Sequence, residues 1–219
     1  MRILRESIKN SPYLGIFCIA TEKHFIVPEQ AERKVLEKIE EALEAEAIKA
    51  SIASTSLLGV LAKANKHGII IPEIAEREEV QELEEKGIKA KVIKGNLALG
   101  NLIALNDSKA VLSPLISKKQ QGEIEKFLKV ECMQAKIGSS ELAGSSMVLT
   151  NNGFLINNNA SKQEFEKIKA FLGVEGKGTT ANYGDSFVGN SVIANTKAVI
   201  VGSLTTNIEL LRIKEGLEV

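Results

Sequence analysis

Apolar and polar positions follow a pattern of about 44 residues that occurs five times along this chain. Each copy holds a glycine, usually after an apolar residue, and then an apolar run, a short polar turn and a second apolar run. A repeat of this length indicates units that stack or close into a ring, because each is too small to bury its own apolar face. The copies lie 44, 41, 44 and 45 residues apart, measured between Gly15, Gly59, Gly100, Gly144 and Gly189.

The second copy shows what each repeat predicts for the backbone. Residues 48–53 are apolar enough for a strand, and the residues from Gly59 onward predict a β-hairpin whose turn runs from Asn65 to Gly68. Asparagine and glycine tolerate the positive φ angles that tight turns often require. The same turn chemistry recurs in other copies at Asn106 and Asp107, at Asn151, Asn152 and Gly153, and at Asn195.

A helix is predicted after each hairpin, because apolar residues then recur at helical spacing. In the first copy Leu36, Ile39 and Leu43 make one apolar stripe. The second helix, around Val80 and Leu83, is expected to be the shortest. The remaining stripes are Ile124, Phe127 and Leu128; Phe165, Ile168 and Leu172; and Ile208 and Leu211.

The starts of these helices are marked in two ways. Pro28 and Pro72 are expected to open the first two, because proline suits the first turn of a helix. In the other copies a serine or threonine is followed three residues later by glutamate or glutamine, the pattern of a capping box. These pairs are Ser117/Gln120, Ser161/Glu164 and Thr206/Glu209.

The predicted elements amount to three strands and one helix per repeat, which is an α/β fold. Five such units can close into a ring, so we expect residues 1–219 to form a single five-bladed α/β propeller domain. An open solenoid would need polar capping units, and neither the first nor the last copy is more polar than the others. The strand Ile3 to Ser7 matches the strand that follows the helix in the other copies, whereas only Gly216 to Val219 follow the last helix. We therefore expect the two termini to meet at the seam of the ring.

Composition and charge narrow the functional classes. Lysine plus arginine and aspartate plus glutamate number 28 each, so the formal net charge is zero. This balance argues against a protein that binds nucleic acid mainly by neutralising phosphates. No apolar stretch approaches the roughly 20 residues of a membrane helix, and the N-terminus MRILRESIKN lacks the apolar segment of a signal peptide. We expect a cytoplasmic protein with no membrane partner.

Catalytic and metal-binding chemistry is poorly represented in the sequence. Both histidines, His24 and His67, are expected in hairpin turns, and the two cysteines, Cys18 and Cys132, lie on apolar strand-like runs. Cys18 and His24 are the nearest candidates for a nucleophile and a base, but a core cysteine and an exposed turn histidine explain them better. No cysteine or histidine spacing typical of a metal site occurs. We predict no catalytic residue, no cofactor and no metal.

Residues suited to recognition gather at one position of the repeat, in the connection that leads to the glycine and just after it. By pseudosymmetry these segments share one face of the ring. Tyrosine and asparagine can be solvated loop residues, but their concentration on one face favours a protein-binding surface. The residues are Asn10, Tyr13, Asn96, Asn101, Asn182, Tyr183, Asp185 and Asn190.

With the repeats aligned, the sequence resembles the archaeal translation initiation factor 6 family. Residues 50–72, ASIASTSLLGVLAKANKHGIIIP, resemble the family pattern A-S-I-A…I-G…G-N-R-H-G-L-L-V-P. LGN at 99–101 with ND at 106–107 resembles the family's L-G-N…N-D, and LTNNG at 149–153 resembles its fourth-repeat turn. These motifs are in register, and the resemblance covers essentially the whole chain.

The resemblance implies a pentein fold in a protein that binds the large ribosomal subunit and sterically blocks joining of the small subunit, without catalysis or cofactor. It also implies a main contact with a uL14-family ribosomal protein, near the sarcin-ricin loop of the large-subunit RNA. Eukaryotic members carry arginine at two of the implied ribosome-binding positions, so those contacts differ here. The implied positions are Gly15, Val60, Lys91 and Asn101, of which Val60 and Lys91 are the arginine positions, and the residue pattern adds Tyr13, Asn96, Tyr183 and Asn190.

Two other classes of function stay open at this point. Guanidine-modifying hydrolases and amidinotransferases share the propeller and use a cysteine nucleophile with a histidine, but the fifth repeat, where they place the nucleophile, has neither residue. The other class is a general interaction scaffold. Binding to ribosomal subunits would distinguish a ribosome-binding factor from such a scaffold. We expect the protein to act as a monomer.

Overall fold

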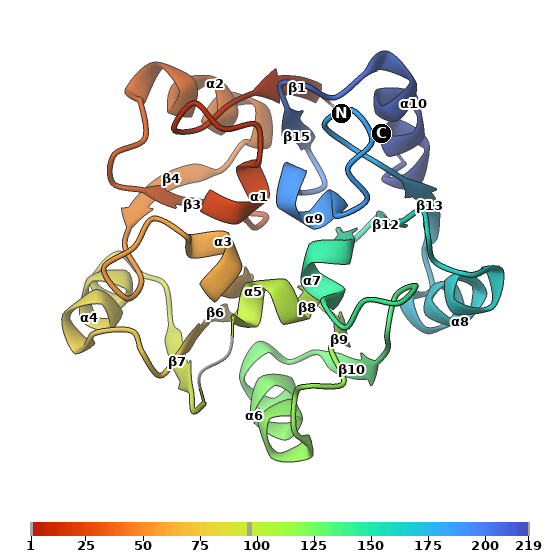
Figure 1. The fold of residues 1–219 in the computed structure, drawn as a ribbon. Coiled ribbons are helices and arrows are strands. Elements are labelled where there is room, and N and C mark those ends of the chain that lie inside the picture. The colour runs from red at the N-terminus through yellow and green to blue at the C-terminus, as the bar shows by residue number, and fades with distance from the viewer. Residues whose placement is uncertain (1, 96–97, 219) are drawn as a thin grey trace.

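The computed structural model of this chain describes residues 2–95 and 98–218 and arranges them as five similar blades around a central axis (Figure 1). In each blade a middle strand pairs antiparallel with an inner strand and parallel with an outer strand. The inner strands are β2 (Ile19–Ala20), β5 (Lys63–Asn65), β8 (Ile103–Leu105), β11 (Met147–Leu149) and β14 (Val192–Ala194). The middle strands are β3 (His24–Pro28), β6 (Gly68–Pro72), β9 (Lys109–Leu112), β12 (Gly153–Asn157) and β15 (Ala198–Gly202). The outer strands are β4 (Glu46–Ala50), β7 (Ala90–Ile93), β10 (Glu131–Gln134), β13 (Glu175–Thr179) and β1 (Arg2–Glu6).

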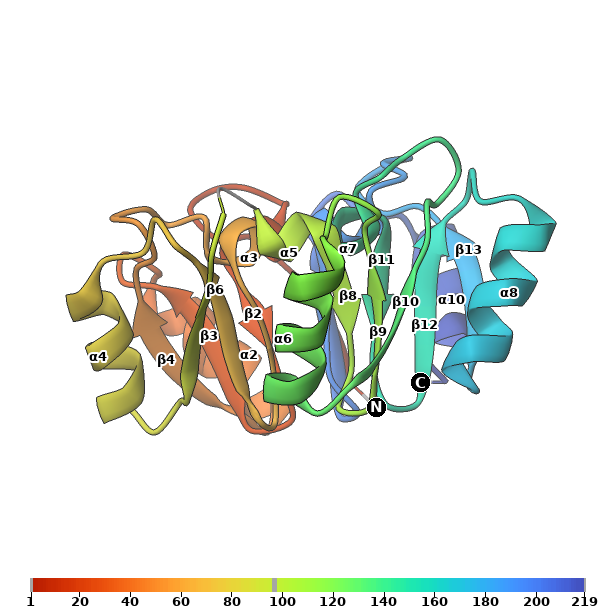
Figure 2. The same cartoon turned by 90° about the horizontal axis from the view of Figure 1, so that it is seen from below.

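Two helices complete each blade, a short one near the axis and a long one at the rim (Figures 1 and 2). The short helices precede the inner strands: α1 (Leu14–Phe17), α3 (Leu58–Leu61), α5 (Leu99–Leu102), α7 (Ala143–Ser146) and α9 (Val188–Ser191). The long helices follow the middle strands: α2 (Arg33–Leu43), α4 (Arg77–Glu85), α6 (Lys118–Leu128), α8 (Lys162–Leu172) and α10 (Asn207–Gly216). Parallel strands need such a crossover, which explains why the long helix stands between middle and outer strand.

The five-bladed α/β propeller expected from the repeats is confirmed, with one correction inside each repeat. A strand was predicted to begin at the anchor glycine, but this glycine is the second residue of a short helix, as Gly59 is in α3. A single turn is too short to show a helical period, and short apolar runs do not distinguish helix from strand. Each repeat therefore has three strands and two helices.

The three predicted capping boxes lie at the starts of long helices, but the two prolines do not. Ser117 and Gln120, together with the other two predicted pairs, bond reciprocally at the starts of α6, α8 and α10. Pro28 and Pro72 instead end strands β3 and β6, and the next helices begin at Arg33 and Arg77. Proline has no N–H and so suits the end of a strand as well as the start of a helix.

Four of the five predicted apolar stripes face the core, and the fifth does not. Leu36, Ile39 and Leu43 are buried in α2, and α4 is the shortest long helix, with nine residues. In α10, however, Ile208 and Leu211 are 68% and 58% exposed. The buried residues of α10 are Glu209, Ile213 and Gly216. The prediction for this helix is wrong because a two-residue stripe does not determine which side of the helix meets the sheet.

The turn asparagines join neighbouring blades instead of supplying positive φ angles. Asn65 donates through Nδ2 to the Asn106 carbonyl oxygen at 3.2 Å and to that of Leu128 at 3.0 Å. Asn106 donates in the same way to Thr150, at 3.0 Å. Neither asparagine has a positive φ, so the reason given for their presence in the turns is corrected. Buried amides that bond across a blade boundary make the spacing of the blades specific.

The core lies between blades, and each cluster of buried apolar side chains draws on two consecutive repeats. Phe25 and Leu43 of the first repeat pack with Ile200 of the fifth. Ile26 of the first packs with Ile69 of the second in the next cluster. The apolar face of each blade is thus covered only when its neighbour is present, as the repeat length indicated.

The ring closes where the two ends of the chain meet, as predicted. β1 pairs in parallel with β15, with Ile3 opposite Val199, and so supplies the outer strand of the fifth blade. The Arg5 side chain adds a hydrogen bond from Nε to the Thr205 carbonyl oxygen at 2.8 Å. Both termini lie beside this blade in Figure 1. The first five described residues thus complete the last repeat.

The anchor glycines form a continuous circle of close backbone contacts around the axis. A Cβ atom on Gly59 would overlap the carbonyl oxygen of Gly15, and one on Gly15 would overlap that of Gly189. The same holds for Gly100 against Gly59 and for Gly144 against Gly100. A side chain at any of these positions would push two short helices apart, so the repeat requires glycine for close approach.

We predict that Gly100→Ala destabilises the protein by about 3 kcal/mol or more, because the new methyl group would lie 2.7 Å from the Gly59 carbonyl carbon. Gly122 in α6 is a matched control, since a Cβ there meets nothing within 4 Å. Gly122→Ala should stabilise by about 0.5–1 kcal/mol, as expected for a helix interior. Urea unfolding measures both changes. Equal unfolding midpoints for the two variants would contradict a glycine circle.

Candidate functional site: the connection face

All five connections that lead to the short helices lie on one side of the ring, which we call the connection face (Figure 2, upper side). It comprises residues 7–13, 51–57, 94–95 with 98, 135–142 and 180–187, together with the short helices. They share a side because each outer strand runs parallel to its middle strand and ends level with it, as Ala50 does opposite Pro28. The fold thereby gathers on one surface the segments that the sequence singled out.

Three of these connections hold two consecutive non-glycine residues in the left-handed conformation. The φ angles are 54° and 58° at Lys9 and Asn10, 54° and 55° at Ala53 and Ser54, and 46° and 65° at Asn182 and Tyr183. Such backbone is uncommon for non-glycine residues and directs successive N–H groups to one side. These concave N–H groups need an acceptor.

In the second blade the acceptor is the buried carboxylate of Glu79 from α4. It accepts hydrogen bonds from the backbone N–H groups of Ala53 and Ser54, at 2.7 and 2.9 Å, and from the Ser51 hydroxyl at 2.8 Å. Burial alone would raise the pKa of Glu79, but the hydrogen bonds from Glu76, Ser54, Ser51 and Ala53 outweigh it and the pKa lies below its usual value. A charged carboxylate therefore holds this connection in place.

Glu209 of α10 has the same role in the fifth blade. It accepts from the Gly184 N–H at 2.8 Å, from the Tyr183 N–H at 3.3 Å and from the Thr180 hydroxyl at 2.8 Å. Burial opposes its ionisation, but the hydrogen bonds from Thr206, Thr180 and Gly184 outweigh burial and lower the pKa of Glu209. The connection carrying Tyr183 is thus fixed while the tyrosine side chain remains 83% exposed.

The residue before each short helix gives the connection face an apolar inner rim. Tyr13, Leu57 and Leu142 occupy this position in three blades and are 36%, 39% and 36% exposed. Ala98 and Phe187 take it in the other two. Most exposed apolar side chains of a soluble domain are scattered, so a rim on one side points to a partner. The sequence pattern singled out only Tyr13 here, although the position relative to the glycine would have identified the rest.

Further exposed apolar side chains lie toward the outside of the same face. Ile74, Leu115 and Leu204 follow the ends of β6, β9 and β15 and are 50%, 53% and 60% exposed. These strand ends lie on the connection side, because Pro72 pairs with Ile93 and Gly202 with Glu6. Sequence reasoning missed these residues because an isolated leucine in a turn carries no pattern.

The predicted site residues separate into three groups. Val60, Asn101 and Asn190 lie half-buried on the short helices, immediately after the anchor glycines, and Gly15 lies beneath them in the glycine circle. Tyr13 and Tyr183 are exposed on the same face. Lys91 is exposed on the outer strand β7, which leads into the third connection. Asn96 lies outside the described residues.

Asn182 departs from its expected place on the surface. It is 7% exposed, and its Nδ2 donates to the Pro12 carbonyl oxygen at 2.8 Å and to the Ser191 hydroxyl at 3.0 Å. These bonds join the fifth connection to the first across the seam. Asn182 is therefore a structural residue, whereas its neighbour Tyr183 is available to a partner.

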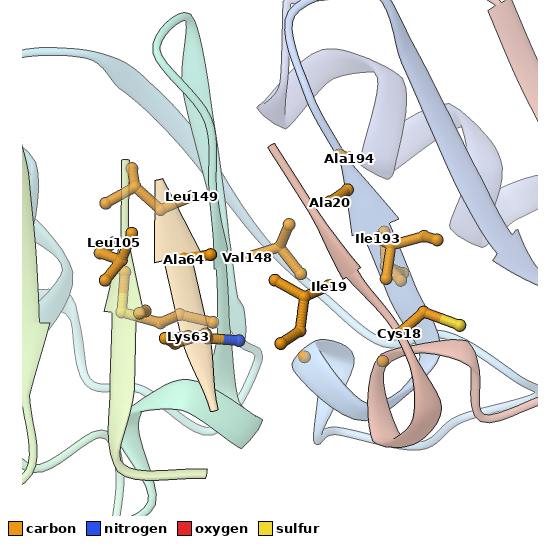
Figure 3. A pocket seen from close by; sticks show the side chains of 15 residues that line it. Cys18, Ile19, Ala20, Lys63, Ala64, Leu105, Val148, Leu149, Ile193 and Ala194 are labelled. Carbon is orange, nitrogen blue, oxygen red and sulfur yellow. The ribbon is translucent and has the colours of Figure 1, made fainter. Parts of the chain in front are cut away.

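The axis of the ring contains a cavity of about 60 Å³ lined mainly by small and apolar side chains (Figure 3). Lys63 and Cys18 line it from the neighbouring second and first blades. Burial lowers the pKa of the Lys63 ammonium to about 8 and raises the pKa of the Cys18 thiol. No histidine lines the cavity, so the lining described lacks the histidine that a cysteine nucleophile would pair with. Cys132 lies in β10, in another blade, and burial and then Glu125 raise its pKa to about 12.

Within residues 2–95 and 98–218 no cluster of three or more histidine, cysteine, aspartate or glutamate side chains has the geometry to hold a metal ion. No helix in the same part of the chain is both long and apolar enough to cross a membrane.

The family model of the eIF-6 family matches residues 3–216. The chain belongs to the eIF-6 family. It is 36% identical over 224 residues to translation initiation factor 6 of Pyrococcus abyssi, covering 99% of each chain, and 37% identical to that of Pyrococcus horikoshii with the same coverage. By these names the relatives are translation factors, so the resemblance seen in the sequence motifs is confirmed.

Among solved structures, the chain is similar to a DDAH from Pseudomonas aeruginosa complexed with citrulline. The TM-score is 0.48 and the identity 16%, with 94% of this chain and 73% of that chain covered. A dimethylarginine dimethylaminohydrolase adduct gives a TM-score of 0.49 at the same identity and coverage. The eIF-6 family assignment rests on the sequence relatives alone.

We predict that Glu79→Gln lowers the free energy of unfolding by about 1–3 kcal/mol at pH 7, because its amide NH₂ would face N–H donors that now bind a carboxylate. The folded pKa of Glu79 is depressed, so its contribution is complete above the unfolded pKa and is lost as pH falls through the folded one. The gap between variant and wild type should narrow below about pH 4. Denaturant unfolding from pH 3 to 7 measures it, and a gap independent of pH would contradict the prediction.

Proposed function

We propose that this eIF-6 family member binds the large ribosomal subunit through its connection face and thereby prevents premature association with the small subunit. The observation that carries the proposal is the apolar rim of Tyr13, Leu57 and Leu142 around the short helices, with Tyr183 beside it. The partner we propose is chiefly a uL14-family ribosomal protein, with local contact to the sarcin-ricin loop RNA. The protein acts in the cytoplasm as a monomer, without cofactor or catalysis.

The chemistry of the connection face supports a protein partner. Interfaces are enriched in tyrosine and in apolar side chains at their centre, with polar residues at their edge. Here Asn101 and Asn190 lie on the short helices that the rim residues precede, and they can donate and accept hydrogen bonds through their amides. A partner that covers the rim would remove apolar surface from water and leave these amides paired.

The charge of the chain supports a limited contact with RNA. A net charge of zero provides little long-range attraction to phosphates. Exposed lysines nevertheless occur in the connections, at Lys9 and Lys94. A few such groups suit an RNA loop that lies beside the protein contact.

The closed ring supports a steric mechanism. Its blades are joined by shared core clusters, by the glycine circle and by the β1–β15 seam, so the protein presents one rigid body of 23.7 kDa. A rigid body bound at the joining surface of one subunit would occupy space that the other subunit needs. No reaction and no change of fold is required.

We predict that Asn101→Asp and Asn101→Arg weaken co-sedimentation with purified large subunits and relieve the block on subunit joining. Asn101 is half-buried on α5, where a charge costs about 1–3 kcal/mol when a partner covers it, or about 5- to 150-fold in affinity. Far-ultraviolet circular dichroism and the unfolding midpoint should show an intact fold.

Lys167→Glu is the matched control, because this exposed lysine lies on α8 at the rim of the ring, away from the connection face. It should leave subunit binding within twofold of wild type. If Lys167→Glu abolishes binding while both Asn101 variants keep full affinity, the proposed surface is on the wrong side of the ring.

We predict that Cys18→Ala lowers the free energy of unfolding by about 1–3 kcal/mol and leaves subunit binding unchanged at permissive temperature. Cys18 is 2% exposed and packs with Leu14 and Phe25 in the first core cluster, so its loss leaves a small void. Hydrolysis of arginine-like substrates is assayed in parallel. An activity present in wild type and lost in Cys18→Ala would contradict a non-enzymatic role.

A further inference from the structure

In three of the five blades, a glutamate at the same position of the long helix interacts with the connection. Glu79 binds the connection 26 residues before it, at Ala53, and Glu209 binds the connection at Tyr183, also 26 residues before it. In the fourth blade Glu164 stands 26 residues after Gly138, whose backbone helps to lower its pKa against the effect of burial. Each glutamate is the third residue of its long helix and belongs to a capping box.

The third blade satisfies its connection with other groups. Gln120 takes the glutamate position and donates through Nε2 to the Lys94 carbonyl oxygen at 2.9 Å. The Gly95 N–H donates to the carboxylate of Glu73 at 3.0 Å. An acidic side chain therefore still accepts from this connection, although it comes from a different position of the repeat.

The first blade has the backbone but not the carboxylate. Lys9 and Asn10 have φ angles of 54° and 58°, matching Ala53 and Ser54 in the second blade. The residue 26 positions after Lys9 is Val35, whose side chain can accept no hydrogen bond. Among the described residues, none accepts a hydrogen bond from the backbone N–H of Lys9 or Asn10.

A solvent-connected cavity of about 270 Å³ lies at this place. Its lining includes Ser7, Lys9, Asn10, Val35 and Ser203, so the two residues that carry the unpaired N–H groups border it. The cavity is larger than a carboxylate group needs, which leaves room for the chain that would carry the group. Neighbouring N–H groups in consecutive left-handed residues form a concave site for an anion.

The charged groups around the cavity do not oppose an anion. Arg5 and Lys9 contribute two cations and Glu6 and Glu32 two carboxylates. The Glu6 carboxylate pairs with the Lys38 ammonium at 3.0 Å, and its side chain is largely buried. Glu32 is exposed to solvent, where its charge is screened. With Lys38 included, cations outnumber carboxylates by one.

We propose that the connection of Lys9 and Asn10 in the first blade is a binding site for a carboxylate from outside the chain. The ligand takes the place that Glu79 and Glu209 take in their own blades, with its two oxygens on the two N–H groups. It is either a small free carboxylate or the acidic side chain of a protein that docks on the connection face. Only the second source rests on the proposed function.

Amide NMR on the full-length protein tests the site. Sodium acetate is titrated into ¹⁵N-labelled protein at pH 7 and constant ionic strength, with sodium chloride and sodium phosphate as comparisons. We expect saturable shifts of the Lys9 and Asn10 amides with acetate, which chloride does not reproduce. Amides of Ala53 and Ser54 are the internal control, since Glu79 occupies them already.

Two variants at Val35 sharpen the test. Val35→Glu places an internal carboxylate at the Glu79 position and should abolish the acetate response, whereas Val35→Ala leaves the cavity open and should keep it. The melting temperature of Val35→Glu should exceed that of Val35→Gln by about 2–4 °C at pH 7, with the difference lost near pH 3. An acetate response that persists in Val35→Glu would overturn the proposal.

Wild-type data alone can also overturn it. Absence of saturation at Lys9 and Asn10, or tighter binding of phosphate than of acetate, would refute a carboxylate site whether or not the variants fold. Co-sedimentation with large subunits then identifies the source. If Val35→Glu weakens subunit binding, the carboxylate belongs to the docked partner; if binding matches wild type, it is a small molecule. The acetate titration does not depend on whether subunits bind at all.

Discussion

The structure depends on the contact between five glycine backbones around the axis. Each anchor glycine lies against the carbonyl oxygen of the glycine in the preceding repeat, from Gly15 through Gly189 and back to Gly15. This spacing brings the five short helices together and brings each sheet against its neighbour, so the apolar clusters between blades are buried. A side chain at one glycine would widen one contact, and because the ring is closed the others could not relax independently.

The connection face follows from this constraint. The short helices are held close by the glycines, so the residues before and after each glycine gather on one surface, where Tyr13, Leu57 and Leu142 remain exposed. The connections of the second and fifth blades adopt left-handed backbone, and the buried carboxylates of Glu79 and Glu209 hold them there. Rigidity and exposed apolar surface therefore arise together. A surface ordered in advance loses little conformational entropy when a partner binds.

Departures from the fivefold pattern mark the places where individual blades differ in chemistry. At the third position of the long helices, Val35 stands where three other blades have glutamate. Among the described residues, no carboxylate accepts a hydrogen bond from the N–H groups of Lys9 and Asn10. The Asn182 side chain donates a hydrogen bond across the seam to the Pro12 carbonyl oxygen of the first repeat. Pseudosymmetry makes such differences visible, because each blade serves as a reference for the others.

The sequence by itself determined the features that depend on residues close in the chain. The repeat length, the capping boxes at Ser117, Ser161 and Thr206, and the unpaired strand at the N-terminus predicted the number of blades, the long helices and the seam, because capping and periodicity are local. The position of the face that carries Tyr13, Asn101 and Tyr183 followed from the repeat as well. The match to the eIF-6 family model confirmed the resemblance that the motifs indicated, and this comparison also uses the sequence alone.

Only the tertiary structure decided features that depend on contacts between repeats. The short helices exist because glycine meets glycine across a blade boundary, and no local period announces a single turn. Asn182 is buried because Pro12 lies across the seam, and α10 exposes Ile208 because the sheet meets its opposite side. The unpaired N–H groups of Lys9 and Asn10 are recognised only when Val35 is compared with Glu79, which has the equivalent position in the second blade. Packing brings these residues close together, although they are distant in the sequence.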